Sequence, residues 1–201
     1  SASPVAENPT VAVLTFANMS NFPEQDFFSD GITEDIITDL SKVSGLTVLG
    51  RNFTAGYKGR TGNPKLIAKE MGVAYVVEGS VRKAGQKIRI NTQLIEGATG
   101  KITWAARYDR DLADTFAIQD EIAMAIVEQL KVTLLPEERK AIEYVATESM
   151  EAYTLYLRGR QIFHSRTKSS LRLARRMFSR ALEIDPAYAR AYAGLADCDS
   201  R

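Results

Sequence analysis

Few residues of this chain are of the types that carry out catalysis or bind metals. Its 201 residues include one histidine, His164, and one cysteine, Cys198. A Cys/His zinc centre needs about four such ligands, and a single cysteine cannot form an internal disulfide. His164 adjoins Ser165, but adjacent helical residues do not face each other, so the two do not form a nucleophile and its base. We expect neither His164 nor Cys198 to have a catalytic role.

Acidic residues gather in one early segment. Paired carboxylates can bind a metal or perform acid–base chemistry. Here their spacing is that of a helix start and its solvent face, which is the interpretation we favour. We therefore predict no metal site, no cofactor and no catalytic residue. The acidic residues are Glu24, Asp26, Asp30, Glu34, Asp35 and Asp39.

A glycine-rich basic loop is the first candidate binding site. Gly56 to Gly62 (GYKGRTG) lies between an expected strand and an expected helix, where glycines, cations and a helix start together can hold a phosphate. The spacing matches neither GxxxxGK[ST] nor GxGxxG, so a flexible connection is the simpler interpretation. If the loop binds a small ligand, the expected binding residues are Arg51, Asn52, Tyr57 and Lys58.

A run of basic residues between Arg158 and Arg180 is the second candidate. It could meet an acidic partner or a phosphate surface, although such runs are usually solvated helix faces. Its candidate partner-binding residues are Arg172, Arg175 and Arg176. The whole chain has 26 Lys+Arg and 25 Asp+Glu, a net charge of +1, which gives no bulk attraction to nucleic acid or anionic membranes.

The hydrophobic pattern predicts an α/β domain over residues 10–135 that positions the loop. Residues 1–9 indicate a linker. The order is β-α-β-α-β-β-β-α, which predicts a mixed sheet of about five strands with flanking helices. Asn63-Pro64 and Gly72 are strong start and stop signals for one of the helices. The expected elements are strands at 11–17 and 46–49, helices at 30–43, 64–71 and 114–134, and three strands between residues 75 and 109.

Those last three strands alternate apolar and polar residues and are joined by short glycine-containing turns, as in an antiparallel meander. We expect Trp104 to be substantially buried on the inner face. The outward residues Arg89, Asn91 and Gln93 indicate that the other face is partly open. Glu78-Gly79-Ser80 is expected to end or bulge a strand.

A connecting helix over 136–150 and an all-helical segment over 151–201 should follow. Ala174, Phe178, Ala181 and Pro186 have tetratricopeptide spacing, and the pattern restarts for one helix of a second, truncated repeat. We expect Tyr188 and Tyr192 of that last helix to pack on the preceding one. The side near Leu195 would stay uncovered, which favours self-association as a homodimer.

Residues 10–135 resemble the TolB amino-terminal-like domain of bacterial signalling proteins. The resemblance rests on the long stretch from VAVLTFANMSNF through YKG to FAIQDEIA, and above all on EGSVR, YDRDL and FAIQDEIA. Thr15 departs from the proline expected there. In that family the domain is followed by tetratricopeptide repeats. The pair often lies behind a class III adenylate/guanylate cyclase domain, or behind a winged-helix DNA-binding domain as in CadC-like regulators.

The resemblance implies a non-catalytic regulatory and protein-interaction module of a larger protein, foremost an adenylate cyclase in cAMP signalling. The alternative is a small-ligand-sensing domain of a membrane-anchored winged-helix regulator. An enzyme in its own right is disfavoured. Partners would be proteins bound by the helical repeats, with no nucleic acid. No apolar run reaches the ~18 residues of a membrane span, so no membrane insertion is expected. The expected compartment is the cytoplasm, or the periplasm if a membrane span precedes the module.

Overall fold

The computed structural model describes residues 8–20, 22–58, 62–165 and 167–200. The chain folds into two units, Ser1–Glu143 and Tyr144–Arg201, which we call the sheet unit and the helical unit. Within the described residues, no helix combines the length and apolarity needed to cross a bilayer.

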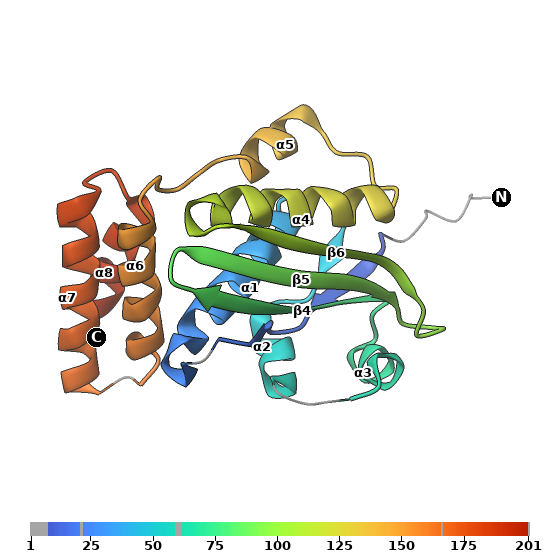
Figure 1. Ribbon diagram of the computed structural model, residues 1–201, viewed down its shortest axis with the longest axis horizontal. Coiled ribbons are helices and arrows are strands. Elements are labelled where there is room, and N and C mark those ends of the chain that lie inside the picture. The colour runs from blue at the N-terminus through green and yellow to red at the C-terminus, as the bar shows by residue number, and fades with distance from the viewer. Residues whose placement is uncertain (1–7, 21, 59–61, 166, 201) are drawn as a thin grey trace. The chain divides into compact units, whose positions relative to one another are not determined.

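The sheet unit contains one mixed sheet, which confirms the predicted fold class (Figure 1). The strand order is β3-β1-β4-β5-β6, and β2 pairs with β4 off this path. β1 runs parallel to β3 and β4, whereas β4, β5 and β6 form the antiparallel meander. The strands are β1 (Thr10–Val13), β2 (Ala17–Asn18), β3 (Thr47–Val48), β4 (Tyr75–Ala84), β5 (Lys87–Glu96) and β6 (Ile102–Asp111).

Helices α1 and α4 pack against each other and cover one face of this sheet, which we call the inner face. Their isoleucines and the inward residues of the strands alternate as a half-buried sheet requires, and they form the main core. The helices of this unit are α1 (Asp26–Ser41), α2 (Arg51–Thr54), α3 (Pro64–Met71), α4 (Thr115–Gln129) and α5 (Pro136–Ile142), with 3₁₀ turns η1 (Pro23–Gln25), η2 (Ala55–Tyr57) and η3 (Leu112–Asp114). The fully buried core residues include Val11, Val13, Ile32, Ile36, Val77, Ile90, Leu94, Ile118, Ile122 and Ile126.

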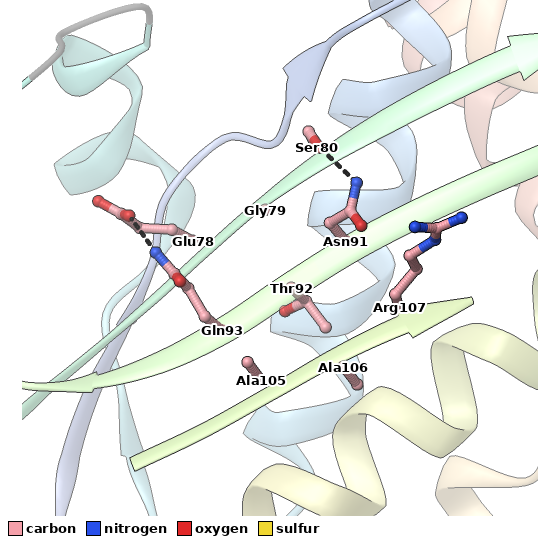
Figure 2. A pocket seen from close by; sticks show the side chains of 9 residues that line it. All are labelled: Glu78, Gly79, Ser80, Asn91, Thr92, Gln93, Ala105, Ala106 and Arg107. Atoms are coloured by element: carbon pink, nitrogen blue, oxygen red, sulfur yellow. Dashed lines mark hydrogen bonds between the residues drawn. The ribbon is translucent and has the colours of Figure 1, made fainter. Parts of the chain in front are cut away.

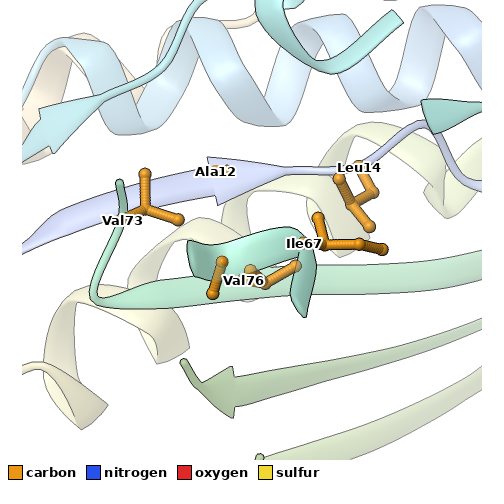
Figure 3. Packing of buried hydrophobic residues seen from close by; sticks show 6 residues of the cluster. Ala12, Leu14, Ile67, Val73 and Val76 are labelled. Carbon is orange, nitrogen blue, oxygen red and sulfur yellow. The ribbon is translucent and has the colours of Figure 1, made fainter. Parts of the chain in front are cut away.

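Helix α3 covers only one end of the opposite, outer face. Its Ile67 packs with Ala12, Leu14 and Val76, as Figure 3 shows. The helix begins and ends as the sequence predicts: the Asn63 side chain accepts a 3.0 Å hydrogen bond from the Lys65 amide, and Gly72 adopts φ = 67°. Because α3 is short, the rest of the outer face is left uncovered.

The predicted strand over 11–17 is interrupted after Val13. The Phe16 amide donates a 3.0 Å hydrogen bond to the hydroxyl of Thr33 on α1 rather than to a strand. The Phe16 ring lies against Gly79, where a Cβ atom would be 2.5 Å from the ring. Gly79 therefore neither ends nor bulges β4, because the register runs unbroken through Gly79↔Thr92, and the irregularity lies at Leu94/Ile95 instead.

Two predicted helices are longer than the observed ones. The helix expected over 114–134 ends at Gln129, because Lys131 adopts φ = 54° and the Val132 amide bonds to the Val127 carbonyl. The helix expected over 136–150 covers Pro136–Ile142 only. Beyond it, Ser149 instead caps the next helix by accepting a hydrogen bond from the Ala152 amide.

The helical unit consists of α6 (Met150–Phe163), α7 (Lys168–Ile184) and α8 (Ala189–Asp199). Phe178 of α7 is the residue around which they pack. A Cβ atom built on Gly159 of α6 or on Gly194 of α8 would lie 2.6 or 2.8 Å from its ring. Tyr188 is fully buried, and its ring lies 5.3 Å from that of Tyr156 on α6.

Tyr192 does not pack on α7 as predicted, because it is 54% exposed. Helix α8 buries Ala191 and Gly194, which are three residues apart and so lie on the same side of the helix. Tyr192 follows Ala191 by one residue, so its side chain is turned away from the buried side of α8 and projects outward.

Gly159→Ala should destabilise the helical unit by about 1–2 kcal/mol. Overpacking against Phe178 costs about 1–3 kcal/mol, and the better helix propensity of alanine returns up to about 1 kcal/mol. Hydrogen exchange of the α6 amides would measure the change as a lower opening free energy. Gly56→Ala is the control, since no atom lies within 4 Å of its added Cβ atom. Equal exchange in both variants would contradict the packing argument.

Asp120→Asn should stabilise the sheet unit at neutral pH. Burial, and secondarily the Asp39 carboxylate, raise the pKa of Asp120 to about 6, against a lowering by Lys42. Ionised Asp120 therefore lowers the free energy of unfolding above pH 6. Protonation removes this loss as the pH falls from 6 towards about 4, the ordinary pKa of an aspartate in the unfolded chain. After allowance for solvent screening we expect about 1 kcal/mol at pH 7–8 and no difference near pH 4. Urea unfolding at three pH values would measure it, with the exposed Asp197→Asn as control.

Candidate functional sites on the sheet face and the helical unit

The predicted ligand-binding loop is fastened to α1 by ion pairs. Arg51, at the start of α2, pairs with Asp30 at 3.7 Å and also with Glu34. The Lys58 ammonium lies 2.8 Å from Asp30 and 3.3 Å from Asp26. The structure thus brings the acidic cluster and the basic loop of the sequence together, and each neutralises the other.

The other two predicted loop residues point elsewhere. The Tyr57 hydroxyl donates a 2.8 Å hydrogen bond to Glu70 of α3, and Asn52 is exposed on α2. The four residues therefore do not converge on one ligand position. An incoming anion would have to displace carboxylates from Arg51 and Lys58. The loop's residues 59–61 lie outside the described residues.

An open groove on the outer face of the meander is a stronger candidate. It has a volume of about 580 Å³ and is lined by Glu78, Gly79, Ser80, Asn91, Thr92, Gln93, Ala105, Ala106 and Arg107. Figure 2 shows these residues along the three strands, with α1 on the far side. The sequence indicated an open face from Asn91 and Gln93, but it did not indicate the groove.

Cross-strand hydrogen bonds order the polar side chains of this groove. The Gln93 amide donates to the Glu78 carboxylate at 3.1 Å, and the Asn91 amide donates to the Ser80 hydroxyl at 3.3 Å. These pairs leave further donor and acceptor positions open, since an amide or hydroxyl group makes more than one hydrogen bond. The groove can therefore recognise a polar ligand by hydrogen bonds.

At one end of the groove, two guanidinium groups share a single carboxylate. Asp109 of β6 accepts hydrogen bonds from Arg89 and, at 2.7 Å, from Arg107. These two guanidinium groups hold the pKa of Asp109 below its usual range. The described residues contain no group of three or more His, Cys, Asp or Glu side chains placed to hold a metal ion.

The floor of the groove is thin. Gly79, Thr92 and Ala106 lie side by side on the three strands. Gly79 has no side chain, and the small side chains of Thr92 and Ala106 belong to the inner face. Thr92 is buried, and its hydroxyl has no hydrogen-bond partner among the described residues. Thr33 is equally buried, but its hydroxyl donates to the Ser29 carbonyl at 2.8 Å and accepts from the Phe16 amide.

The basic run of the sequence lies mainly on α7 of the helical unit. Arg175 is engaged by Asp199 of α8 at 2.6 Å. Arg172 and Arg176 are exposed, and so is Arg180. Their spacing of four residues places them in one row along the helix, a signal that could have selected Arg180 in place of Arg175.

The lone histidine and cysteine occupy ordinary structural positions. Nδ1 of His164 lies 2.7 Å from the Arg160 carbonyl at the end of α6. Burial, first, and the neighbouring Asp199 raise the pKa of the Cys198 thiol, which makes it less reactive.

Residues 7–125 match the family described as the second domain of HilA/YgeH-like transcriptional regulators. The match covers more than half of the chain, and the chain belongs to this family.

A relative shows a second context. The chain is 52% identical over 187 residues to "Putative adenylate cyclase 3" of Rhizobium meliloti (strain 1021). The match covers 93% of this chain but 32% of that protein, so the chain spans about a third of its relative's length.

Solved structures resemble this chain more distantly. TolB from Acinetobacter baumannii has a TM-score of 0.47 at 17% identity and covers 61% of this chain and 28% of its own. Lipoprotein GNA1162 from Neisseria meningitidis has a TM-score of 0.44 at 15% sequence identity. The match covers 61% of this chain and 98% of the lipoprotein. The C-terminal domain of LpoB from Salmonella enterica has a TM-score of 0.41 at 18% sequence identity. The match covers 53% of this chain and 85% of the LpoB domain.

Thr92→Val should leave the stability of the sheet unit unchanged or raise it by about 1 kcal/mol, because it removes an unpaired buried hydroxyl. Thr33→Val, the matched control, should cost about 2–3 kcal/mol, since it leaves the Phe16 amide unsatisfied. Urea unfolding followed by the fluorescence of Trp104, the single tryptophan, reports on this unit. A comparable loss in both variants would show that the Thr92 hydroxyl has a partner.

Proposed function

We propose that this chain is a non-catalytic regulatory and protein-interaction module of a larger bacterial signalling protein, a class III adenylate cyclase. The observation that carries the proposal is the 52% identity to a protein named as an adenylate cyclase. The match is 187 residues long, whereas the sheet unit ends at Glu143, so part of the helical unit matches as well. Because two thirds of that relative lie outside the match, its catalytic domain has room elsewhere.

The chemistry of the described residues supports binding rather than catalysis. The cations of the basic loop are paired with carboxylates. In the groove, the Ser80 hydroxyl is hydrogen-bonded to Asn91 and the Glu78 carboxylate to Gln93, rather than to each other. A module of this kind can change the activity of a neighbouring domain by binding, through differential contacts with its two states.

We assign the helical unit to the tetratricopeptide class, as a repeat followed by the first helix of the next. Small residues at Gly159 and Gly194 facing Phe178 support this, because such repeats stack helices closely around an aromatic residue. A protein partner would then meet the exposed arginines Arg172 and Arg176, whereas Arg175 is engaged by Asp199. Such a module would act in the cytoplasm.

The family match favours a second candidate function. The chain belongs to a family described by a domain of transcriptional regulators. In this alternative the module senses a small ligand for a membrane-anchored winged-helix regulator, in the periplasm if a membrane span precedes it. The outer-face groove, with Ser80 and Asn91, would be the ligand site.

A domain exchange in the Rhizobium relative tests the first function. Deleting the matched segment should change cyclic AMP output several-fold without abolishing it, and inserting the present chain should restore the original output. Purified chain given ATP or GTP with Mg²⁺ or Mn²⁺ should yield no cyclic nucleotide. Unchanged output after deletion would rule out a regulatory role. Turnover by the isolated chain that is lost on mutation within it would rule out a non-catalytic one.

A thermal-shift panel of nucleotides and anions separates the two candidates. The sensing function predicts that a ligand raises the melting temperature by several degrees, and that Asn91→Leu removes the shift. Arg172→Leu, on the helical unit, is the control and should retain it. The first function predicts no shift with any member of the panel.

A further inference from the structure

Strand β6 is an unprotected edge of the sheet. In the described part of the chain it pairs with β5 alone, although it is ten residues long. None of its residues is fully buried. The opposite edge strand, β3, has two residues. Long exposed edges pair readily with other strands, and proteins usually shorten, charge or cover them.

The strand register identifies which backbone groups face outward. In antiparallel pairs, hydrogen-bonded and non-hydrogen-bonded positions alternate. The Leu112 amide donates a hydrogen bond to the Gln86 carbonyl, just outside the β5–β6 ladder. Counting residue pairs along the ladder from Gln86↔Leu112, every second pair is therefore hydrogen-bonded, and Thr92↔Ala106 is one of these. The intervening residues direct their N–H and C=O groups away from the sheet. Before the register irregularity at Leu94/Ile95 is reached, these are Ala105, Arg107, Asp109 and Asp111.

The side chains of β6 give this edge little protection in its first half. Ile102 to Ala106 contain no charge, and Ile102 is 56% exposed. Trp104 and Tyr108 are only half-buried on the inner face, so the predicted burial of Trp104 is incomplete within one chain. A strand added along β6 would cover both aromatic rings.

A second copy of β6 fits this edge in one register better than in any other. In an antiparallel pair of two identical strands, each residue opposes one whose side chain lies on the same face of the sheet. The two-fold axis must therefore pass between one residue and the same residue of the second copy, and each register is named by that residue. The register irregularity at Leu94/Ile95 puts Ile102 on the outer face, so only residues 104–111 of β6 are regular; axes through Ala106 and Arg107 overlap 104–108 and 104–110 of this part. An axis through Arg107 places that arginine opposite its symmetry mate, which is repulsive. An axis through Ala106 opposes Trp104 to Tyr108.

We propose that β6 pairs antiparallel with β6 of a second copy of this chain about a two-fold axis through Ala106, making one continuous sheet across both copies. Ala105 of each copy then exchanges backbone hydrogen bonds with Arg107 of the other. The groove residues Ala105 and Arg107 lie next to the axis, so the grooves of the two copies adjoin. This proposal does not depend on the function proposed above.

Proline at position 105 provides the principal test. The Ala105 amide points away from β5, so Ala105→Pro removes an edge donor without breaking the existing ladder. Sedimentation velocity over a concentration series should show a dimer for the wild type. Ala105→Pro should weaken dimerisation about 30-fold, since two backbone hydrogen bonds are lost, one from each copy. Ala105→Val retains the amide and is the matched control.

Disulfide trapping tests the register. Ala106 would face its symmetry mate at a non-hydrogen-bonded position, where Cβ atoms approach to about 4.5 Å, as a disulfide needs. In a Cys198→Ser background, Ala106→Cys should form covalent dimers on mild oxidation. Ala105→Cys should not, because it faces Arg107 of the other copy.

Charge substitutions keep the proposal testable if the proline variant fails to fold. Ala105→Glu should strengthen dimerisation and Ala105→Lys should weaken it, since both would oppose Arg107. A chain that stays monomeric at high concentration would overturn the proposal. So would a dimer that is indifferent to Ala105→Lys and does not cross-link through position 106, which would place the contact elsewhere, for instance on α8.

Discussion

The contact of Phe16 with Gly79 determines how the sheet unit is assembled. The Phe16 ring occupies the space that any side chain at position 79 would need, and the Phe16 amide binds Thr33 of α1. One residue thus joins the central strand β4 to the helix that covers it. The same contact takes the chain out of the ladder after β1, which allows it to return as β2 beside the later part of β4.

The meander gains both of its exposed features from this arrangement. Gly79, Thr92 and Ala106 keep the floor of the outer-face groove thin, while Phe16 fills the inner side beneath Gly79. Since α3 is only eight residues long and lies at one end, the outer face remains open. Since no further strand follows β6 in the described residues, the meander also ends in a free edge. The groove and the free edge are therefore neighbours on the same strands.

Features set by local chemistry were predictable from the sequence. The capping of α3 by Asn63 and Gly72 and the alternation of the meander depend on neighbouring residues only. The break at Phe16 was not predictable, since it depends on Thr33 and Gly79, which are distant in sequence. The end of α4 was missed because a lysine, Lys131, takes the left-handed conformation usual for glycine. For the site, the sequence indicated the cations Arg51 and Lys58 and the acidic cluster around Asp30 separately, but not their pairing, which depends on the fold.

In the helical unit, the placement of Phe178 has a consequence for folding cooperativity. Its ring is in contact range of glycines on both α6 and α8, so neither helix can reach its final distance from α7 until the ring is in place. A hairpin of two of these helices would leave one side of the ring in water, and apolar surface exposed in this way opposes a stable partial structure. The three helices should consequently form and unfold as one unit, with no stable two-helix intermediate.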